Sequence, residues 1–318
     1  MTSHLVSLSD IRAAAEVIRP HVHRTPVLTS AYFDDLFGAR IFFKCENFQK
    51  VGAFKARGAC NAVFTLSEDV ARQGVATHSS GNHAQAVAYA AKLRGIPCHI
   101  VMPASAPAIK RNAVCDYGAN IVECKPTMAS REQTLLDVVQ RTSAHPIPPY
   151  NDVRVIAGQG TAALELMDEI KDLDTIMTPV GGGGLMSGTA ACARGLKPTI
   201  EVLGAEPEIA DDARRSLLAG NILPSGDPMT IADGLRGMLG PITFQHIQAH
   251  HVQIHTAREE SIRLAMGLVL ERMKIVVEPS AVVTIAAALE NPGLLKDKRV
   301  GIVLSGGNLE MRSLWTKS

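Results

Sequence analysis

The segment Thr175-Ile-Met-Thr-Pro-Val-Gly-Gly-Gly-Gly-Leu-Met-Ser-Gly-Thr-Ala-Ala-Cys-Ala-Arg194 contains three structural signals in direct succession. Residues 175–180 predict a short buried strand, the four glycines at 181–184 predict a turn, and residues 184–194 predict a helix. A continuous apolar strand that passes through a short turn into a helix is typical of a parallel sheet in an α/β protein.

The same alternation continues on both sides of this segment. Short apolar runs occur at 74–77, 100–102, 121–122, 202–205 and 300–304, and helical patterns occur at 106–117, 130–141, 161–171 and 210–219. We therefore predict an α/β fold with a mainly parallel sheet. A chain of 318 residues is long enough for two domains. The Pro-rich residues 144–149 interrupt the helical pattern, so we interpret them as a crossover between domains.

Charge and composition argue against two classes of partner. The chain has 32 Lys and Arg against 31 Asp and Glu, and only 4% aromatic residues, so neither nucleic acid nor a membrane surface is expected as a partner. The most apolar late stretch, residues 275–289, is interrupted by Glu278 and Pro279 and is too short to span a bilayer. No signal-peptide pattern is present, and none of the six cysteines has C-x-x-C spacing, so we expect reduced thiols in a cytoplasmic protein.

The four glycines also indicate a chemical role. Glycine N–H groups can close on an anion, and the start of a helix adds a favourable dipole, so Gly181, Gly182, Gly183 and Gly184 predict a phosphate site. A flexible turn is the alternative. The spacing matches neither a P-loop nor a dinucleotide fingerprint with a downstream acid.

Two polar loops follow other apolar runs. Ser305-Gly-Gly-Asn308 follows residues 301–304, a position where α/β sheets bind ligands, although a plain turn has the same pattern. His78-Ser-Ser-Gly-Asn-His83 follows residues 74–77, and its hydroxyls, amide and helix-start N–H groups suit a carboxylate. A metal site built from His78 and His83 is a poor match, because Gly81 interrupts the segment and the spacing does not place them on one helix face.

Lys55 lies between Phe54 and small residues at a predicted helix start. Apolar surroundings disfavour the charged form of a lysine, which suits Schiff-base chemistry. A solvated surface lysine is the alternative that local sequence alone would favour. We interpret Lys44 and Lys50 as solvated or structural.

These motifs, with Ile156-Ala-Gly-Gln-Gly-Thr161, occur in the order found in a known family, and they span nearly the whole chain. Together they resemble the serine/threonine dehydratase–serine racemase family of pyridoxal-phosphate (PLP) enzymes of fold type II. The resemblance implies two open, twisted parallel-sheet domains with the cofactor in the cleft between them. It places residues 1–73 and 152–318 in a large domain and 74–151 in a small mobile domain, and it implies a homodimer.

The resemblance also assigns roles to single residues. Lys55 forms the Schiff base with PLP, Asn82 binds the ring hydroxyl, and Ser305 faces the pyridine nitrogen. A serine there leaves the ring largely unprotonated, which favours β-elimination over reactions that need a long-lived carbanion. The remaining implied cofactor contacts are Phe54, Tyr150, Gly181, Gly182, Gly183, Gly184 and Leu185. The implied contacts to the substrate are Ser79, Ser80, Asn82, His83 and Arg131.

The segment Glu206-Pro-Glu-Ile-Ala-Asp-Asp212 is rich in carboxylates, which suit a hard cation. Acids that complement a helix dipole are the alternative. The resemblance implies a structural or activating Mg²⁺ (or Mn²⁺ or Ca²⁺) held by Glu206, the Ala210 carbonyl and Asp212.

The implied reaction is β-elimination from a small β-hydroxy-α-amino acid, either 3-hydroxyaspartate or serine or threonine, giving a 2-oxo acid and ammonia. Lys55 would remove the α-proton on one face, and Ser80 matches the acid and base of the second face in serine racemases. Serine racemase is therefore one alternative, a PLP β-replacement enzyme is a less favoured one, and a non-enzymatic sensor would be expected to lose the lysine.

Locally, Arg131 is typical of a surface arginine paired with an acid. The resemblance instead places it in the closing domain, where it would bind a second substrate carboxylate.

Overall fold

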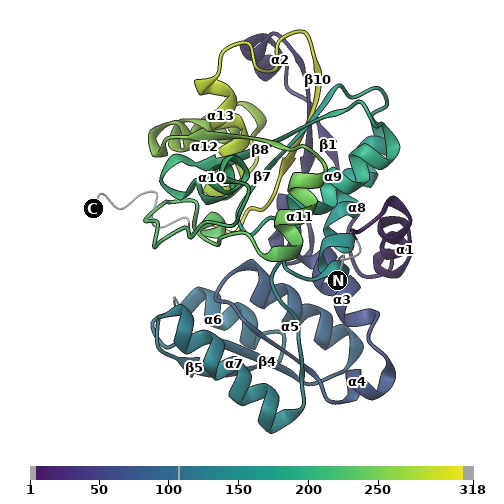
Figure 1. Cartoon of the computed structure of the whole chain (residues 1–318), viewed down its shortest axis with the longest axis vertical. Coiled ribbons are helices and arrows are strands. Elements are labelled where there is room, and N and C mark those ends of the chain that lie inside the picture. The colour runs from purple at the N-terminus through teal and green to yellow at the C-terminus, as the bar shows by residue number, and fades with distance from the viewer. Residues whose placement is uncertain (1–4, 107, 311–318) are drawn as a thin grey trace.

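The larger of two sheets forms the upper half of the molecule in Figure 1. The computed structural model describes residues 5–106 and 108–310. The six strands of this sheet, in spatial order, are β1 (Val27–Leu28), β2 (Arg40–Cys45), β10 (Arg299–Leu304), β7 (Thr175–Pro179), β8 (Glu201–Pro207) and β9 (Gln253–Ala257). All neighbours run parallel except β1 and β2, which are antiparallel, so the predicted mainly parallel sheet is confirmed.

The smaller sheet lies in the lower half of the same view. Its four strands, in spatial order, are β5 (Asn120–Cys124), β4 (Cys98–Pro103), β3 (Val75–His78) and β6 (His145–Pro146). Every pair is parallel. The Pro-rich segment contains β6, and the chain then enters α8 (Val153–Glu169), which packs beside the larger sheet. The predicted crossover therefore lies where the chain passes from one sheet to the other.

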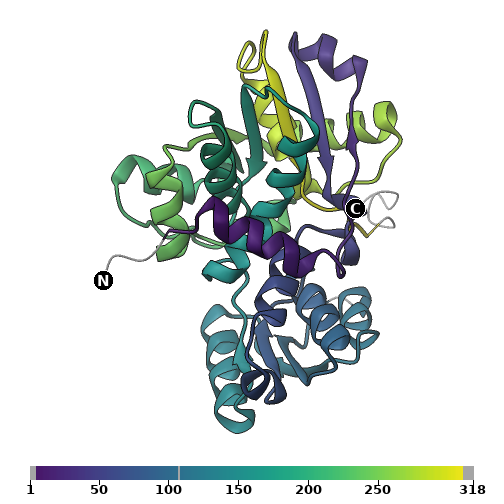
Figure 2. The ribbon, with the colours of Figure 1, turned by 90° about the vertical axis from the view of Figure 1, so that its right-hand side faces the viewer.

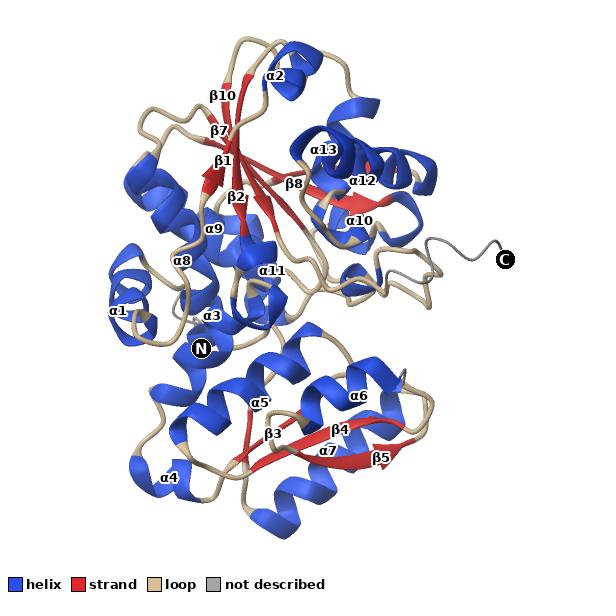
Figure 3. Cartoon of the chain, turned by 180° about the vertical axis from the view of Figure 1, so that it is seen from behind, coloured by secondary structure: helices blue, strands red, loops and turns tan. Residues whose placement is uncertain are grey.

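Helices cover both faces of the larger sheet, as Figure 3 shows. The helices other than α8 are α1 (Leu8–Ile18), α2 (Ala31–Phe37), α3 (Lys55–Phe64), α4 (Glu68–Arg72), α5 (Asn82–Arg94), α6 (Ala108–Cys115), α7 (Met128–Thr142), α9 (Gly184–Leu196), α10 (Asp212–Ala219), α11 (Pro241–Ala249), α12 (Glu259–Met273) and α13 (Val283–Glu290). Alternate strand residues enter separate apolar cores. Ile176 and Val202 pack with α8 and α9, whereas Met177 and Leu203 pack with α12 and α13. Burial on both faces explains why these strands read as continuous apolar runs.

Helix α1 lies against α3, α8 and α9, across the front of the view in Figure 2. Its start follows from the sequence, because Ser7 and Asp10 form a reciprocal capping box. In the part of the chain that the structure describes, no helix has the length and apolar character needed to cross a membrane.

One helix begins earlier than the pattern predicts. We expected a helix over 161–171, but α8 begins at Val153. The Asp152 side chain caps it by accepting from the N–H groups of Arg154 at 2.8 Å and Val155 at 3.2 Å. The first turns contain β-branched residues and glycines, which hide helical periodicity, so the cap is the better signal of the start.

Candidate active site

The predicted motifs meet where loops of the two sheets approach each other. Asn82 follows β3 of the smaller sheet, and Asn308 follows β10 of the larger sheet. The Asn308 Nδ2 donates to Asn82 Oδ1 at 2.9 Å, which joins the two loops directly. The Phe54 N–H donates to the carbonyl of Ser305 at 3.0 Å, so the start of α3 lies beside the same loop. Ligands of α/β proteins bind at such carboxyl ends of parallel strands.

Lys55 is the first residue of α3, as the sequence predicted. Its Nζ donates to the carbonyl of Pro149 at 2.6 Å and lies 5.1 Å from the centre of the Phe54 ring. Burial lowers the pKa of Lys55 to about 8, while the nearby Glu278 opposes that shift. About one tenth of an amine with this pKa is uncharged at pH 7, far more than for an ordinary lysine, which makes it a usable nucleophile and base.

The glycine loop between β7 and α9 has no room for side chains. Gly183 has a φ of +86°, and a Cβ there would lie 2.7 Å from Leu239 Cδ2. A Cβ on Gly182 would lie 2.2 Å from the Tyr150 ring, and one on Gly184 would lie 2.9 Å from Tyr150 Cβ. No side chain caps the N-terminus of α9. The first N–H groups of α9 therefore suit a phosphate, and the loop fits the phosphate end of PLP.

Glu278 is a site residue that the sequence analysis noted only as an interruption of an apolar stretch. It is buried, and its carboxylate accepts from Asn82 Nδ2 at 3.0 and 3.1 Å and from the Asn308 N–H at 3.2 Å. Burial raises the pKa of Glu278 to about 7, against the hydrogen bond from Asn82. A lone carboxylate inside an otherwise apolar run was the available signal, because such a group is normally buried only with partners.

Ser305 is buried at the end of β10, and Ser79 and Ser80 are partly buried in the loop after β3. The Gly81 N–H donates to Ser79 Oγ at 3.3 Å. Helix α5 then begins at Asn82 without a side-chain cap, so N–H groups of its first turn remain available to an anion. This arrangement agrees with the predicted carboxylate site.

His83, which the sequence predicts as a contact to the substrate carboxylate, uses its side chain for another contact. It is buried, and its Nε2 lies 2.9 Å from the carbonyl of Ile147. Burial and, to a smaller extent, the charge of Lys55 lower the pKa of His83 to about 3. The ring is therefore neutral and donates its Nε2–H to that carbonyl. Its unpartnered Nδ1 can then only accept, so the backbone N–H of His83 is the donor that remains for a substrate carboxylate.

Arg131 lies in the first turn of α7 and is partly buried. Within the described residues it forms no ion pair, and its Nε is buried without a hydrogen-bond partner. The expectation of a surface arginine paired with an acid is therefore wrong. His78, at the end of β3, is close enough for Arg131 to lower its pKa, after the larger effect of burial. Arg131 thus stands at the carboxyl end of the smaller sheet with a donor unused.

Glu206, Ala210 and Asp212 are all buried beside the start of α10. The Glu206 carboxylate accepts from the N–H groups of Ala213 at 3.1 Å and Arg214 at 2.9 Å, so it caps that helix. Neither Asp212 oxygen has a side-chain partner among the described residues. Burial raises the pKa of Asp212 to about 6, while the nearby backbone N–H groups of Leu239 and Asp212 oppose that shift. The described residues contain no group of three or more His, Cys, Asp or Glu placed for a metal. The predicted ligand set has only two such side chains, Glu206 and Asp212, together with the Ala210 carbonyl, so it does not form such a group.

Lys44 is not a solvated residue. It is fully buried, and its Nζ lies 2.6 Å from Glu165 Oε2. Burial lowers the pKa of Lys44, while Glu165 opposes that shift. Its role is therefore structural, and Lys50 remains the only one of the two that can serve as a neutral control.

Residues 18–306 match the model of the family described as pyridoxal-phosphate dependent enzyme. The chain is 49% identical over 311 residues to the beta-hydroxyaspartate dehydratase of Paracoccus denitrificans, covering 98% of this chain and 99% of that protein. It is 48% identical over 315 residues to the serine racemase of Dictyostelium discoideum, covering 97% of each. The crystal structure of a T.th. threonine deaminase superposes with a TM-score of 0.90 at 43% identity, covering 96% of this chain and 99% of that one. The chain therefore belongs to the family of pyridoxal-phosphate dependent enzymes, with the fold-type II architecture that its motifs predict.

Proposed function

We propose that this protein is a PLP-dependent ammonia-lyase that removes water from a small β-hydroxy-α-amino acid, with 3-hydroxyaspartate as the preferred substrate, and releases a 2-oxo acid and ammonia. The observation that carries the substrate choice is Arg131, whose buried Nε has no partner among the described residues. A second carboxylate would satisfy it through paired N–H donors. The relative from Paracoccus denitrificans, named beta-hydroxyaspartate dehydratase, supports the same substrate.

The cofactor would be held at both ends by the loops described above. Lys55 would bind its aldehyde, and the loop of Gly181, Gly182, Gly183, Gly184 and Leu185 would hold its phosphate. Asn82 and Ser305 would contact the ring edge, with Phe54 and Tyr150 packed beside it. When bound, PLP supplies an electron-withdrawing ring that makes the substrate α-proton acidic.

Proton transfer at the α-carbon falls to Lys55. With its pKa lowered to about 8, the amine can accept the α-proton near neutral pH without a large energetic penalty. We assign Ser80, partly buried in the loop after β3, to the opposite face of the α-carbon. The α-carboxylate would accept from Ser79, from Ser80 and from the N–H groups of Asn82 and His83 at the start of α5.

The domain boundaries are part of the proposal: residues 74–151 would move as a small domain against residues 1–73 and 152–318. All strands of the smaller sheet lie within that range, which supports it. The partly exposed ion pair of Lys110 and Asp233, at 2.7 Å, would be one of the contacts that open and close. Helix α3 packs on both parts, since Val63 shares an apolar core with Val87 of α5, so we expect motion around α3.

Three further assignments belong to the proposal. Mg²⁺ (or Mn²⁺ or Ca²⁺) would bind Glu206, the Ala210 carbonyl and Asp212. The buried Asp212 carboxylate, which has no side-chain partner among the described residues, supports this. A homodimer is proposed from the family resemblance. A cytoplasmic location is proposed because all six cysteines are unpaired in a chain without C-x-x-C spacing.

Serine racemase activity is the second candidate. Racemisation needs proton-transfer groups on both faces of the α-carbon, and the chain has both Lys55 and Ser80. The relative from Dictyostelium discoideum carries that name. A panel of serine, threonine and both 3-hydroxyaspartate diastereomers, assayed for oxo acid and for inverted amino acid, separates the two activities.

Replacement of Lys55 by alanine tests the proposed function. The variant should fold, lose the visible absorption that borohydride bleaches in the wild-type holoenzyme, and lose turnover of every substrate in the panel. Lys50→Ala is the matched control, since Lys50 is a nearby, partly buried lysine, and it should keep both properties. Lyase activity retained by purified Lys55→Ala would refute the assignment.

A further inference from the structure

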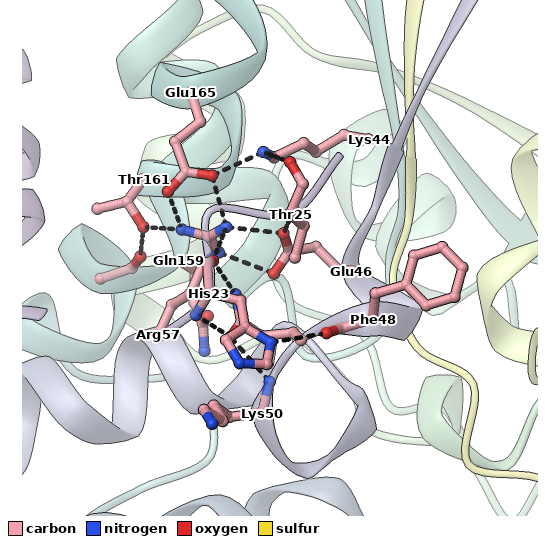
Figure 4. A network of polar contacts seen from close by, with 12 residues as sticks. His23, Thr25, Lys44, Glu46, Phe48, Lys50, Arg57, Gln159, Thr161 and Glu165 are labelled. Atoms are coloured by element: carbon pink, nitrogen blue, oxygen red, sulfur yellow. Dashed lines mark hydrogen bonds and ion pairs between the residues drawn. The ribbon is translucent and has the colours of Figure 1, made fainter. Parts of the chain in front are cut away.

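Arg57, two residues after Lys55, is fully buried in a network of charged side chains (Figure 4). On one side its guanidinium donates to Glu46, with Nε to Oε2 at 2.7 Å and Nη2 to Oε1 at 2.8 Å. Glu46 directly follows β2. Arg57 therefore ties the first turn of α3 to the carboxyl end of β2 through a bidentate contact.

On its other side Arg57 binds helix α8. Its Nη1 and Nη2 each donate to Glu165 at 2.8 Å, and Nη1 also donates to Thr161 Oγ1 at 3.2 Å. Lys44 donates to the same Glu165, so the cluster holds two positive and two negative side chains. Burial disfavours the charged guanidinium, but Glu46 and Glu165 raise the pKa of Arg57 above its usual value. The first turn of α3 is thus fixed from two directions by hydrogen-bonded side chains of β2, its following turn and α8.

Glycines bring the backbones of α3, α8 and α9 into direct contact. A Cβ on Gly158 of α8 would lie 2.6 Å from the Gly58 Cα and 2.7 Å from the Arg57 carbonyl oxygen. A Cβ on Gly188 of α9 would lie 2.5 Å from the Gly160 backbone nitrogen of α8. Because backbone meets backbone at both places, neither α3 nor α9 can shift toward α8. This is the structural use of the Gly-Gln-Gly-Thr motif, to which the proposed reaction gives no role.

Helix α3 begins at Lys55, and α9 begins at the end of the glycine loop. Helix α8 therefore sets the spacing between the amine and the phosphate cradle. We propose that Arg57 is a positioning residue which, with the Gly158 contact, holds the Lys55 amine at the distance from the glycine loop that the two ends of one rigid cofactor require. This inference rests on the proposed function of Lys55 and of the glycine loop.

Displacement of the Lys55 amine should affect only the bond between this amine and the aldehyde of PLP. The uncharged amine of Lys55 adds to the aldehyde carbon, one water leaves, and a C=N bond forms with no change in oxidation state. Pyridoxamine 5′-phosphate has the same ring and phosphate but no aldehyde, so it cannot form this bond. A displaced Lys55 would weaken binding of PLP and leave binding of pyridoxamine phosphate nearly unchanged.

The experiment measures the affinities of the apoprotein for both compounds in Arg57→Lys and in Gly158→Ala. Arg57→Lys keeps the charge but loses the forked contacts to two carboxylates. We expect PLP affinity to fall by about tenfold or more, because misplacing a reacting group by about 1 Å costs up to about a hundredfold. Pyridoxamine phosphate should bind within about threefold of its wild-type affinity. Equal weakening of both ligands, or no change in either, would overturn the inference.

Arg94→Lys is the matched control. Arg94 donates to the carbonyls of Val63 and Leu66 and so fixes the opposite end of α3. It should lower stability without changing the ratio of the two affinities. If Arg57→Lys does not fold, Thr161→Val removes one contact of Arg57 while keeping every charge. The dissociation constant of PLP, divided by that of pyridoxamine phosphate, must then still rise in Thr161→Val or in Gly158→Ala. An unchanged ratio in both would overturn the inference.

Borohydride reduction of the wild-type holoenzyme, followed by peptide mapping, separates this inference from the proposed function. The reduced cofactor should be attached to Lys55. Attachment to another lysine would refute the proposed function itself. Attachment to Lys55 with unchanged affinity ratios in the variants would refute only the role of Arg57.

Discussion

Gly183→Ala tests the packing of the phosphate loop. The residue has a φ of +86°, where an L side chain is strained by about 1–2 kcal/mol. The added methyl group would also lie 2.7 Å from Leu239 Cδ2, 2.9 Å from Thr243 Cβ and 3.1 Å from Ile247 Cδ1. These three side chains are buried, so they have little room to move. Overpacking of this kind costs a further 1–3 kcal/mol, roughly. We therefore expect the free energy of unfolding of Gly183→Ala to fall by about 2–5 kcal/mol in total.

Gly95→Ala is the matched control for the backbone strain alone. Gly95 has a φ of +70° after α5, but a Cβ there meets no atom within 4 Å. We expect the free energy of unfolding of Gly95→Ala to fall by only about 1–2 kcal/mol. Urea denaturation of both apoproteins, with comparable m-values, gives the difference between them. Gly183→Ala should also weaken binding of pyridoxamine phosphate, while Gly95→Ala should not. Equal loss of stability in the two variants, with unchanged ligand binding, would refute the packing and the cradle together.

Three further predictions follow from single residues of the site. Arg131→Ala should lose about 1.5–3 kcal/mol of transition-state stabilisation in kcat/KM for 3-hydroxyaspartate and little for threonine; equal losses on both would show that Arg131 serves closure or folding instead. Because Glu278 keeps its proton up to about pH 7 when folded but releases it near its usual 4.5 when unfolded, the stability of the apoprotein should fall with rising pH across that window by about 3 kcal/mol. Glu278→Gln should lack that part of the fall in urea denaturation at pH 5 and pH 8, and an unchanged difference would contradict the burial argument. Chelation should lower the melting temperature of the wild type and Mg²⁺ should restore it, because a cation that binds only the folded state stabilises that state. The melting temperature of Asp212→Ala should not respond to either treatment. If metal-stripped wild type also fails to respond to Mg²⁺, Glu206 is a helix cap only.

The fold was predictable where short segments carry complete signals. The strand, glycine turn and helix around Gly183 lie within 20 consecutive residues, and the structure has them as β7, the loop and α9. The position of Lys55 at a helix start was predictable for the same reason, since its apolar neighbours are adjacent in sequence.

The site was not predictable where a role depends on contacts between distant residues. Glu278 acts through Asn82, which is 196 positions away, so no local pattern could show that they meet. The sequence left open whether Lys44 is solvated or structural, because its partner Glu165 is 121 residues distant. The contact between the His83 ring and the Ile147 carbonyl joins residues 64 positions apart, so the sequence could not show it either.

The proposed reaction removes water and ammonia from a β-hydroxy amino acid with two carboxylates. The most direct measurement incubates the wild-type holoenzyme separately with each 3-hydroxyaspartate diastereomer, with serine and with threonine, and quantifies 2-oxo acid and ammonia. We expect equal amounts of 2-oxo acid and ammonia, formed faster from one 3-hydroxyaspartate diastereomer than from threonine. Formation of inverted amino acid without oxo acid, or turnover of threonine above both 3-hydroxyaspartates, would contradict it.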